Sequence, residues 1–363
     1  MVATFQNGCG QRRQPRQFHQ IITAGAMLVC LMWHTSITRG AELERFEFHE
    51  PHLGTLVELT LYASDETVAN QSARAAYTRI EELNRILSDY NPDSEVMRLC
   101  KTAGTGQAVK VSPELFEVLA RSIEYAKATD GAFDVSIGPV VRLWRAARRQ
   151  KKVPPKAELA AAMALVDWKQ IVLDPKAQTV ELRKQGMLLD FGGIAKGYIA
   201  DQARAVLAAK GVSRCLVAVA GDIAVGDSPP GRGGWRIGIA PLDKPDGEPS
   251  RYLLLTNCSV STAGDAFQFV EIGGVRYSHI VDPATGLGLT RRISVTVVAP
   301  QGISADGLDT AISIVGPDRG MKLIEQSQGA AGLIVLENQG DGLTVLESPG
   351  LVKFLAPTEG ASR

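Results

Sequence analysis

Short strand-like runs joined by tight turns constrain the fold of this chain more than any other feature of its sequence. The runs Gln170–Leu173 and Thr179–Leu182 are separated by little more than Asp174-Pro175-Lys176-Ala177, a turn of hairpin length. Similar runs follow at Met187–Leu189, Cys215–Ala220, Trp235–Ala240, Tyr252–Leu255, Ile293–Val298 and Gly332–Leu336. Because hairpin turns join antiparallel neighbours, the pattern predicts an α+β fold with mixed or mostly antiparallel sheets and flanking helices, not a doubly wound parallel sheet.

The helices are predicted from apolar spacing and capping residues. After an alternating strand at Leu56–Tyr62, a helix is expected from about Glu66, with its apolar residues three and four positions apart. Ser112-Pro113 is typical of a helix start, and this second helix should end before Gly131. Further helices are expected from near Pro155 and over Lys196–Lys210, Ala305–Ile314 and Asp318–Gln326, with surface loops flanking a strand in Gly226–Gly247.

The N-terminus has a pattern of its own. Arg12, Arg13 and Arg16 precede the apolar run Ile21–Trp33, and small residues follow near Gly40. A basic region, an apolar core of about 7–15 residues and small residues describe a secretory signal, whereas a transmembrane helix needs about 20 apolar residues. We therefore expect residues 1–40 to be a signal peptide or, alternatively, an N-terminal anchor. The protein is expected to be exported, periplasmic or attached to the outer face of the inner membrane.

Composition excludes several function classes. Lys+Arg and Asp+Glu both number 39, so nothing favours a nucleic-acid partner. Cys100, Cys215 and Cys258 have no CxxC spacing, which argues against a disulfide framework and a zinc site and favours buried free thiols. Beyond His52 the only histidine is His279, which excludes an HExxH protease and a three-histidine zinc enzyme.

The first segment that suggests chemistry is Leu189–Tyr198. A strand ending in Asp190, two glycines and a helix would present backbone N–H groups and a positive dipole to an anion. Lys196 would add a point charge for a phosphate. The alternative is a structural glycine turn.

The second segment is the predicted helix that contains Asp306, Asp309 and Thr310. These residues stand at i, i+3 and i+4, on one helical face. Two carboxylates and a hydroxyl are hard oxygen ligands suited to Mg²⁺. Alternatively, the acids only complement the dipole at the helix N-terminus.

The third segment comprises Ser261–Asp265 and Arg276–Gly286. His279 is flanked by strand-like residues and followed by an Asp-Pro-x-Thr-Gly turn, an arrangement that would place its side chain at the rim of a site. A lone histidine can equally be structural.

In this order the segments resemble the FAD:protein FMN transferases, the ApbE-type flavin transferases formerly called thiamine biosynthesis lipoproteins. The resemblance extends from about Leu53 to Leu336 and includes Leu53-Gly54-Thr55, Tyr90–Glu95, Gly131–Ser136, Gly138–Trp144, Ala220-Gly221-Asp222 and Trp235–Ile239. It implies an ApbE-like, T-fold-related architecture and a flavin transferase domain over residues 41–363.

The resemblance also implies an activity, the Mg²⁺-dependent transfer of FMN from FAD to a Thr or Ser hydroxyl of an acceptor protein, with release of AMP. The acceptors would be flavoprotein subunits of membrane redox complexes. The alternatives are an FAD pyrophosphatase that releases FMN and AMP, and a non-catalytic flavin-binding protein.

Site residues follow from the same resemblance. The Mg²⁺ ligands would be the Asp306 carboxylate, the Thr310 hydroxyl and the Gly193 carbonyl, with Asp309 as a further ligand. Contacts to flavin and adenosine are implied for Leu53, Tyr90, Ala132, Phe133, Asp134, Asp190, Lys196 and Ile280. Lys196 would also offset phosphate charge in catalysis. His279 is the candidate base, and Asp282 is the residue that could orient it.

Overall fold

The computed structural model describes residues 42–265, 268–338, 340 and 342–357. The predicted signal peptide or anchor lies outside these residues. Within them, none of the helices combines the length and the apolar character that crossing a membrane requires. The three cysteines in this part of the chain are free and buried, as predicted.

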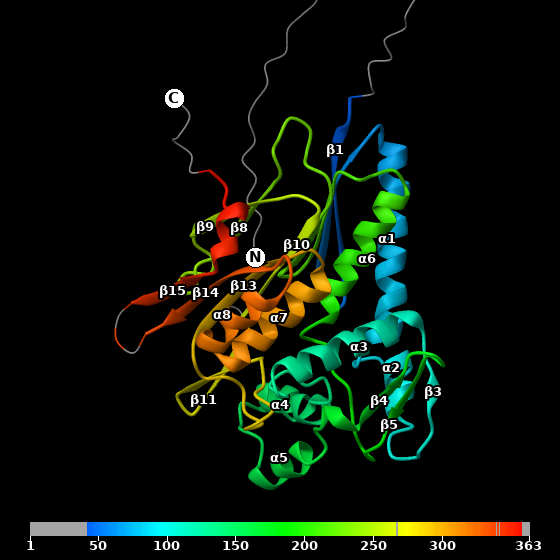
Figure 1. The fold of residues 1–363 in the computed structure, drawn as a ribbon, viewed down its shortest axis with the longest axis vertical. Coiled ribbons are helices and arrows are strands. Elements are labelled where there is room, and N and C mark those ends of the chain that lie inside the picture. Colours follow the sequence, from blue (N-terminus) through cyan, green and yellow to red (C-terminus); the bar gives the residue numbers. More distant parts are fainter. Residues whose placement is uncertain (1–41, 266–267, 339, 341, 358–363) are drawn as a thin grey trace, which may run out of the picture.

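The centre of the described fold is an antiparallel sheet of eight strands, in the order β1-β2-β6-β7-β10-β13-β14-β15 (Figure 1). Its strands are β1 (Glu44–His52), β2 (Thr55–Ala63), β6 (Cys215–Val219), β7 (Asp222–Val225), β10 (Cys258–Gly264), β13 (Ile293–Ala299), β14 (Ala331–Glu337) and β15 (Leu343–Glu347). All neighbours pair antiparallel, which confirms the predicted fold class.

Two-residue periodicity explains why the central strands have no exposed face. In β6, Cys215 and Val217 enter one hydrophobic core, while Leu216 and Ala218 enter another on the opposite face. Successive side chains of a strand point to opposite faces, so a continuous apolar run indicates a strand covered on both sides.

Helices cover one face of the sheet. They are α1 (Glu66–Leu87), α6 (Ala195–Ala209), α7 (Gly302–Val315) and α8 (Pro317–Gln326), which contact β2, β6, β13 and β14 respectively (Figure 1). The hairpin of β8 (Trp235–Ile239) and β9 (Arg251–Leu255), with the 3-10 helix Pro349–Phe354, packs on the other face.

A second group of elements lies below the α1 and α6 helices in Figure 1. It comprises α2 (Glu95–Cys100), α3 (Pro113–Ala128), α4 (Gly138–Gln150), α5 (Lys156–Met163), the 3-10 helix Trp168–Gln170 and the small sheet β3 (Val109–Lys110), β4 (Ile171–Asp174), β5 (Thr179–Leu182). The hairpin β11 (Phe269–Ile272) and β12 (Val275–Ser278) contributes Val270 and Tyr277 to the core formed with α4 and α5.

One predicted strand is wrong. Met187 and Leu189 are buried and Leu188 is half-buried, but only Leu188 forms a bridge, a single parallel one with Ile137. The apolar run reflects burial in the core and not pairing in a sheet.

The helix predicted over Ala305–Ile314 begins earlier, at Gly302. The Asp201 carboxylate on α6 accepts hydrogen bonds from the Gly302 and Ile303 amides, at 2.5 and 3.4 Å. The cap comes from a residue distant in sequence, so local pattern does not reveal it.

Candidate active site

The site is organised where α6 and α7 cross. A β-carbon on Gly197 would lie 2.1 Å from the Gly302 carbonyl oxygen and 2.8 Å from the Asp306 Cβ. Only a residue without a side chain allows this approach. The Gly197 amide also donates to Asp306 Oδ2 at 2.9 Å, which fixes the carboxylate next to the start of α6.

Replacing Gly197 with Ala should therefore force the two helices apart. We expect a loss of about 1–3 kcal/mol in the free energy of unfolding, measured by urea denaturation, because the clash is with backbone and cannot be relieved by a rotamer change. Gly233→Ala is the matched control, since its β-carbon would meet its nearest neighbour at 3.6 Å. Equal stability of the two variants would contradict this view of the crossing.

Lys196 of α6 lies among acids of two other elements, β7 and α7. Its ammonium pairs with Asp222 from β7 and lies 3.8 Å from Asp306 Oδ1. Burial alone would lower the pKa of Lys196, but Asp222, Asp306 and Asp309 outweigh that effect and raise it. Since 36% of its side-chain surface is exposed, the lysine remains charged and accessible to a ligand.

When all three acids are ionised, their negative charge exceeds the single positive charge of Lys196, and the pKa values of Asp306 and Asp309 are raised. Burial and then the charge of Asp222 raise the pKa of Asp306 to about 7, against an ordinary value of 3.8. Burial and then Asp306 raise that of Asp309 well above its ordinary value. Three carboxylates around one ammonium favour an additional cation.

The Asp309 carboxylate lacks hydrogen-bond donors among the described residues. Both its carboxylate oxygens are buried and receive no hydrogen bond from the described residues. The nearby Ser261 hydroxyl helps to lower the pKa of Asp309, but its single proton is donated to Asp222 Oδ1 at 2.6 Å. Buried carboxylates are normally paired or bind metals, so this residue fits a cation ligand.

Thr310 and the glycine loop meet beside these acids. A β-carbon on Gly193 would lie 2.9 Å from Thr310 Oγ1, so the loop backbone runs against that hydroxyl. In the part of the chain that the structure describes, no group of three His, Cys, Asp or Glu side chains could hold a metal. A cation here would need hydroxyl, carbonyl, water or substrate oxygens as well.

Asp190 lies in a second charged cluster. Arg145 of α4 pairs with Asp190 at 2.8 Å and with Asp89, and its guanidinium stacks 3.9 Å from the centre of the Tyr90 ring. Burial and then the charge of Asp89 raise the pKa of Asp190 to about 6. Tyr90 is 75% exposed, so most of its surface is open to a ligand.

Asp134 and its neighbours are held by protein contacts. The Asp134 carboxylate accepts hydrogen bonds from the amide and hydroxyl of Ser136 and from the Trp168 amide, at 2.6–3.0 Å. Phe133 is buried against Tyr125, and the Ala132 amide donates to the Thr129 carbonyl. Their predicted role at the flavin nucleotide stays a prediction.

His279 follows β12 and shares an electrostatic environment with Lys196. Burial, assisted by the charges of Arg148 and Lys196, lowers the pKa of His279 from 6.5 to about 4, while a contact with the Gln268 carbonyl opposes the shift. That carbonyl lies 3.2 Å from His279 Nδ1. Ile280 is buried directly after it.

Asp282 forms hydrogen bonds within its own turn. Its carboxylate accepts from the Ala284 amide at 2.8 Å and from the Thr285 hydroxyl at 3.3 Å. Among the described residues, no hydrogen bond connects Asp282 with His279. The role of Asp282 in orienting His279 therefore stays a prediction. Gln268 provides the oxygen that faces the imidazole.

Leu53 lies at the tip of the β1–β2 hairpin, with φ +55°, followed by Gly54 at +71°. Positive φ at both positions is the geometry of a two-residue hairpin turn. A hollow of about 580 Å³ adjoins the tip and is lined by Pro51, His52, Leu53, Gly54, Thr55, Leu56, Glu81 and Asn84.

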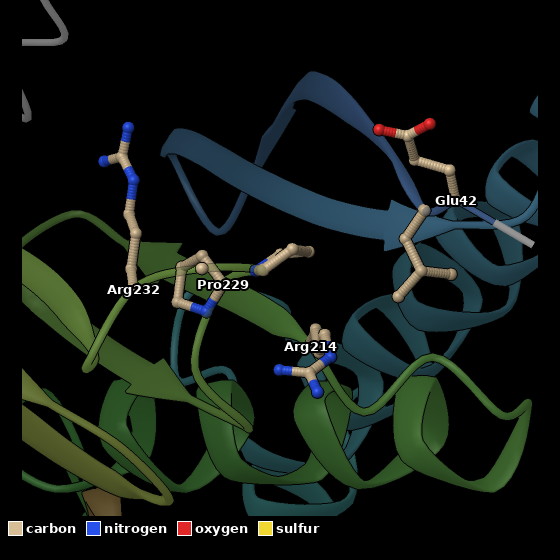
Figure 2. A pocket seen from close by; sticks show the side chains of 7 residues that line it. Glu42, Arg214, Pro229 and Arg232 are labelled. Atoms are coloured by element: carbon tan, nitrogen blue, oxygen red, sulfur yellow. The ribbon is translucent and has the colours of Figure 1, made fainter. Parts of the chain in front are cut away.

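Another hollow, of about 550 Å³, lies at the start of β1. Glu42 and Arg232 stand on opposite sides of it, with Arg214 and Pro229 between them (Figure 2). None of the predicted site residues lines it.

The structure thus brings Lys196, Asp306, Asp309, Thr310 and the Gly193 loop together, and connects Asp190 with Tyr90 through Arg145. The prediction of site residues missed Asp222, Ser261, Arg145 and Arg148. The only signal for the arginines was their spacing in Arg142–Arg149, and Asp222 stood in a quoted motif without a role.

Comparisons with known proteins show what the chain is similar to. The model of the ApbE family matches residues 53–334. A FAD:protein FMN transferase of Haemophilus influenzae is 31% identical over 287 residues, which are 77% of this chain and 82% of the relative. One from Klebsiella pneumoniae (strain 342) is 30% identical over 306 residues, 83% of this chain and 92% of the relative.

Solved structures are similar as well. The flavin transferase ApbE from Vibrio cholerae superposes with a TM-score of 0.76 at 28% identity, covering 86% of this chain and all (100%) of that one. An ApbE protein from Thermotoga maritima has a TM-score of 0.77, also at 28% identity and with the same coverage.

Proposed function

The chain belongs to the ApbE family, and on that premise we propose that it transfers FMN from FAD to a Thr or Ser hydroxyl of an acceptor protein and releases AMP. The observation that carries the proposal is the cluster at the α6–α7 crossing, in which Asp309 is buried beside Asp306 and Lys196 and receives no hydrogen bond from the residues that the structure describes. Such a cluster suits a substrate that arrives with a divalent cation and phosphates.

Mg²⁺ fits the residues present. Asp306, Asp309, the Thr310 hydroxyl and the Gly193 carbonyl would hold it, and their hard oxygen atoms are the ligands it prefers. When bound, Mg²⁺ would supply Lewis-acid stabilisation of charge on the phosphate oxygens.

The residues of the chain then have distinct tasks. The acceptor oxygen forms a bond to the FMN-side phosphorus, and the bond from that phosphorus to the bridging oxygen breaks, so that AMP leaves with the electron pair. His279 is the proposed acceptor of the hydroxyl proton. Its pKa of about 4 keeps the imidazole neutral at pH 7 and therefore able to take a proton.

Lys196 offsets negative charge on the phosphates, and Asp222 holds its ammonium in place. Tyr90 offers an exposed aromatic face to a ring of the substrate. Leu53, at the hairpin tip, would provide an apolar contact.

The acceptors we propose are flavoprotein subunits of membrane redox complexes. An exported protein, periplasmic or attached to the outer face of the inner membrane, would meet them there. This location rests on the pattern of residues 1–40 alone.

Two other functions predict different results from one assay. The full chain is incubated with FAD and Mg²⁺, with and without a candidate acceptor domain. Covalent flavin fluorescence on the acceptor and a mass increase equal to FMN would support transfer. Release of AMP at the same rate without acceptor would identify a pyrophosphatase. Tight FAD binding without AMP release would identify a binding protein.

A further inference from the structure

Two arginines of α4, one turn apart, have opposite surroundings. Arg145 pairs with Asp89 and Asp190. Arg148 forms no hydrogen bond or ion pair with the described residues, although its Nε atom is buried. Burial lowers the pKa of Arg148, and the like charge of Arg145 adds to that effect.

The guanidinium of Arg148 is half-buried, and its Nε atom has lost contact with water without gaining a hydrogen bond from the described residues. Transfer of a charge out of water costs several kcal/mol unless a counter-charge is present. Arg145 bridges Asp89 and Asp190, whereas none of the described residues pairs with Arg148. A ligand anion would supply the missing partner.

Helix packing places Arg148 at the proposed site. Trp144, one turn earlier on α4, donates from Nε1 to the Gly286 carbonyl at 2.7 Å and packs on Tyr277 with ring centres 5.0 Å apart. Residues four apart share a helical face, so Arg148 lies toward the segment that contains His279. The charges of Arg148 and Lys196 both lower the pKa of His279. Tyr90 in turn raises the pKa of Arg148.

We propose that Arg148 binds a phosphate of the FAD diphosphate and determines the preference for a phosphorylated flavin. The inference rests on the proposed function and assigns a substrate-binding residue on the α4 side of His279. A guanidinium presents paired donors that match phosphate oxygens, and the low local polarity strengthens the contact. Unlike Lys196, which the acids around it already offset, Arg148 would supply a positive charge without a carboxylate partner among the described residues to a diphosphate that carries two negative charges.

Binding without turnover tests the proposal. Dissociation constants of FAD and of riboflavin, which has no phosphate, are measured by fluorescence with the full chain in EDTA and without acceptor. For Arg148→Ala and Arg148→Gln we expect FAD binding weakened about 10- to 100-fold and riboflavin binding changed less than about 2-fold. Arg149→Ala removes the same charge from the exposed neighbour and should change neither constant.

Thermal melting separates binding from folding. Both Arg148 variants are expected to melt at or above the wild-type temperature, because the substitution removes a half-buried charge that has no partner among the described residues. Equal losses for FAD and riboflavin, or unchanged FAD binding, would overturn the role in phosphate binding. Wild-type protein that fails to bind FAD when Mg²⁺ is present would instead refute the proposed function itself.

Discussion

Asp306→Asn is expected to lower FMN transfer by about 10²- to 10³-fold at saturating FAD. The substitution preserves the shape of the side chain and an oxygen for the Gly197 amide, but removes the negative charge next to Lys196. Loss of one preorganised electrostatic contact typically has an effect of about this size. The measurement is covalent FMN on the acceptor as a function of Mg²⁺ concentration, where the variant should show no saturation in the wild-type range.

The same variant should be more stable than wild type when no divalent cation is present. Asp306 has a pKa of about 7 in the folded protein and 3.8 as an ordinary value. Because the folded state holds the proton more tightly, stability from this group is lost as pH rises from about 4 through 7. At pH 8 in EDTA, Asp306→Asn should therefore melt at a higher temperature than wild type.

Addition of Mg²⁺ should reverse that order, because binding to the native state stabilises wild type alone. Asp246→Asn, in an exposed loop, is the control and should behave as wild type in both assays. Full transfer activity in Asp306→Asn, with an unchanged response to Mg²⁺, would show that the metal assignment is wrong.

His279→Gln is the second variant with a large expected effect. A positioned general base contributes about 10²- to 10⁴-fold, so we expect kcat to fall by that factor with little change in the KM for FAD. Glutamine can keep a contact with the Gln268 carbonyl but cannot accept the proton. His49→Gln is the control, because His49 lies exposed on β1, paired with Glu58 at 3.3 Å.

The pH profile gives an independent test of His279. Its pKa of about 4 lies below the ordinary 6.5, so the base is already neutral at pH 6. In wild type, protonation of His279 should make the transfer rate fall near pH 4. In the variant this fall should be absent. Because the unfolded chain takes up the proton first, His279 also lowers stability as pH falls from about 6.5 toward 4.

The Gln variant should lose less stability over that interval. If His279→Gln transfers FMN at the wild-type rate, another group removes the proton. If the transfer rate of wild type falls near pH 6.5 instead of pH 4, the buried environment of the imidazole is contradicted.

Some of the fold was predictable because it depends on local sequence. Ser112 caps α3 by accepting from the Leu115 amide at 3.2 Å, as Ser112-Pro113 predicts. The alternating run at Leu56–Tyr62 lies within β2. The helix α4 was not predicted, since Gly138-Pro139 and an arginine-rich sequence obscure its apolar face, which Val140, Trp144 and Ala147 form against α5.

For the site, the sequence by itself determined which groups share an element. Asp306, Asp309 and Thr310 lie on one helix, and their spacing alone places them on one face. Likewise, the position of Lys196 three residues after Gly193 is set by the order of residues along the chain.

Only the tertiary structure decided what faces these groups. Asp222 meets Lys196 because β7 lies between β6 and β10, and Gly197 meets Gly302 because α6 and α7 cross on the same face of the sheet. Strand order and helix crossing depend on packing of the whole core, which no local pattern encodes. For the same reason two arginines of α4 differ in their surroundings: among the described residues, Arg145 has two carboxylate partners and Arg148 has none.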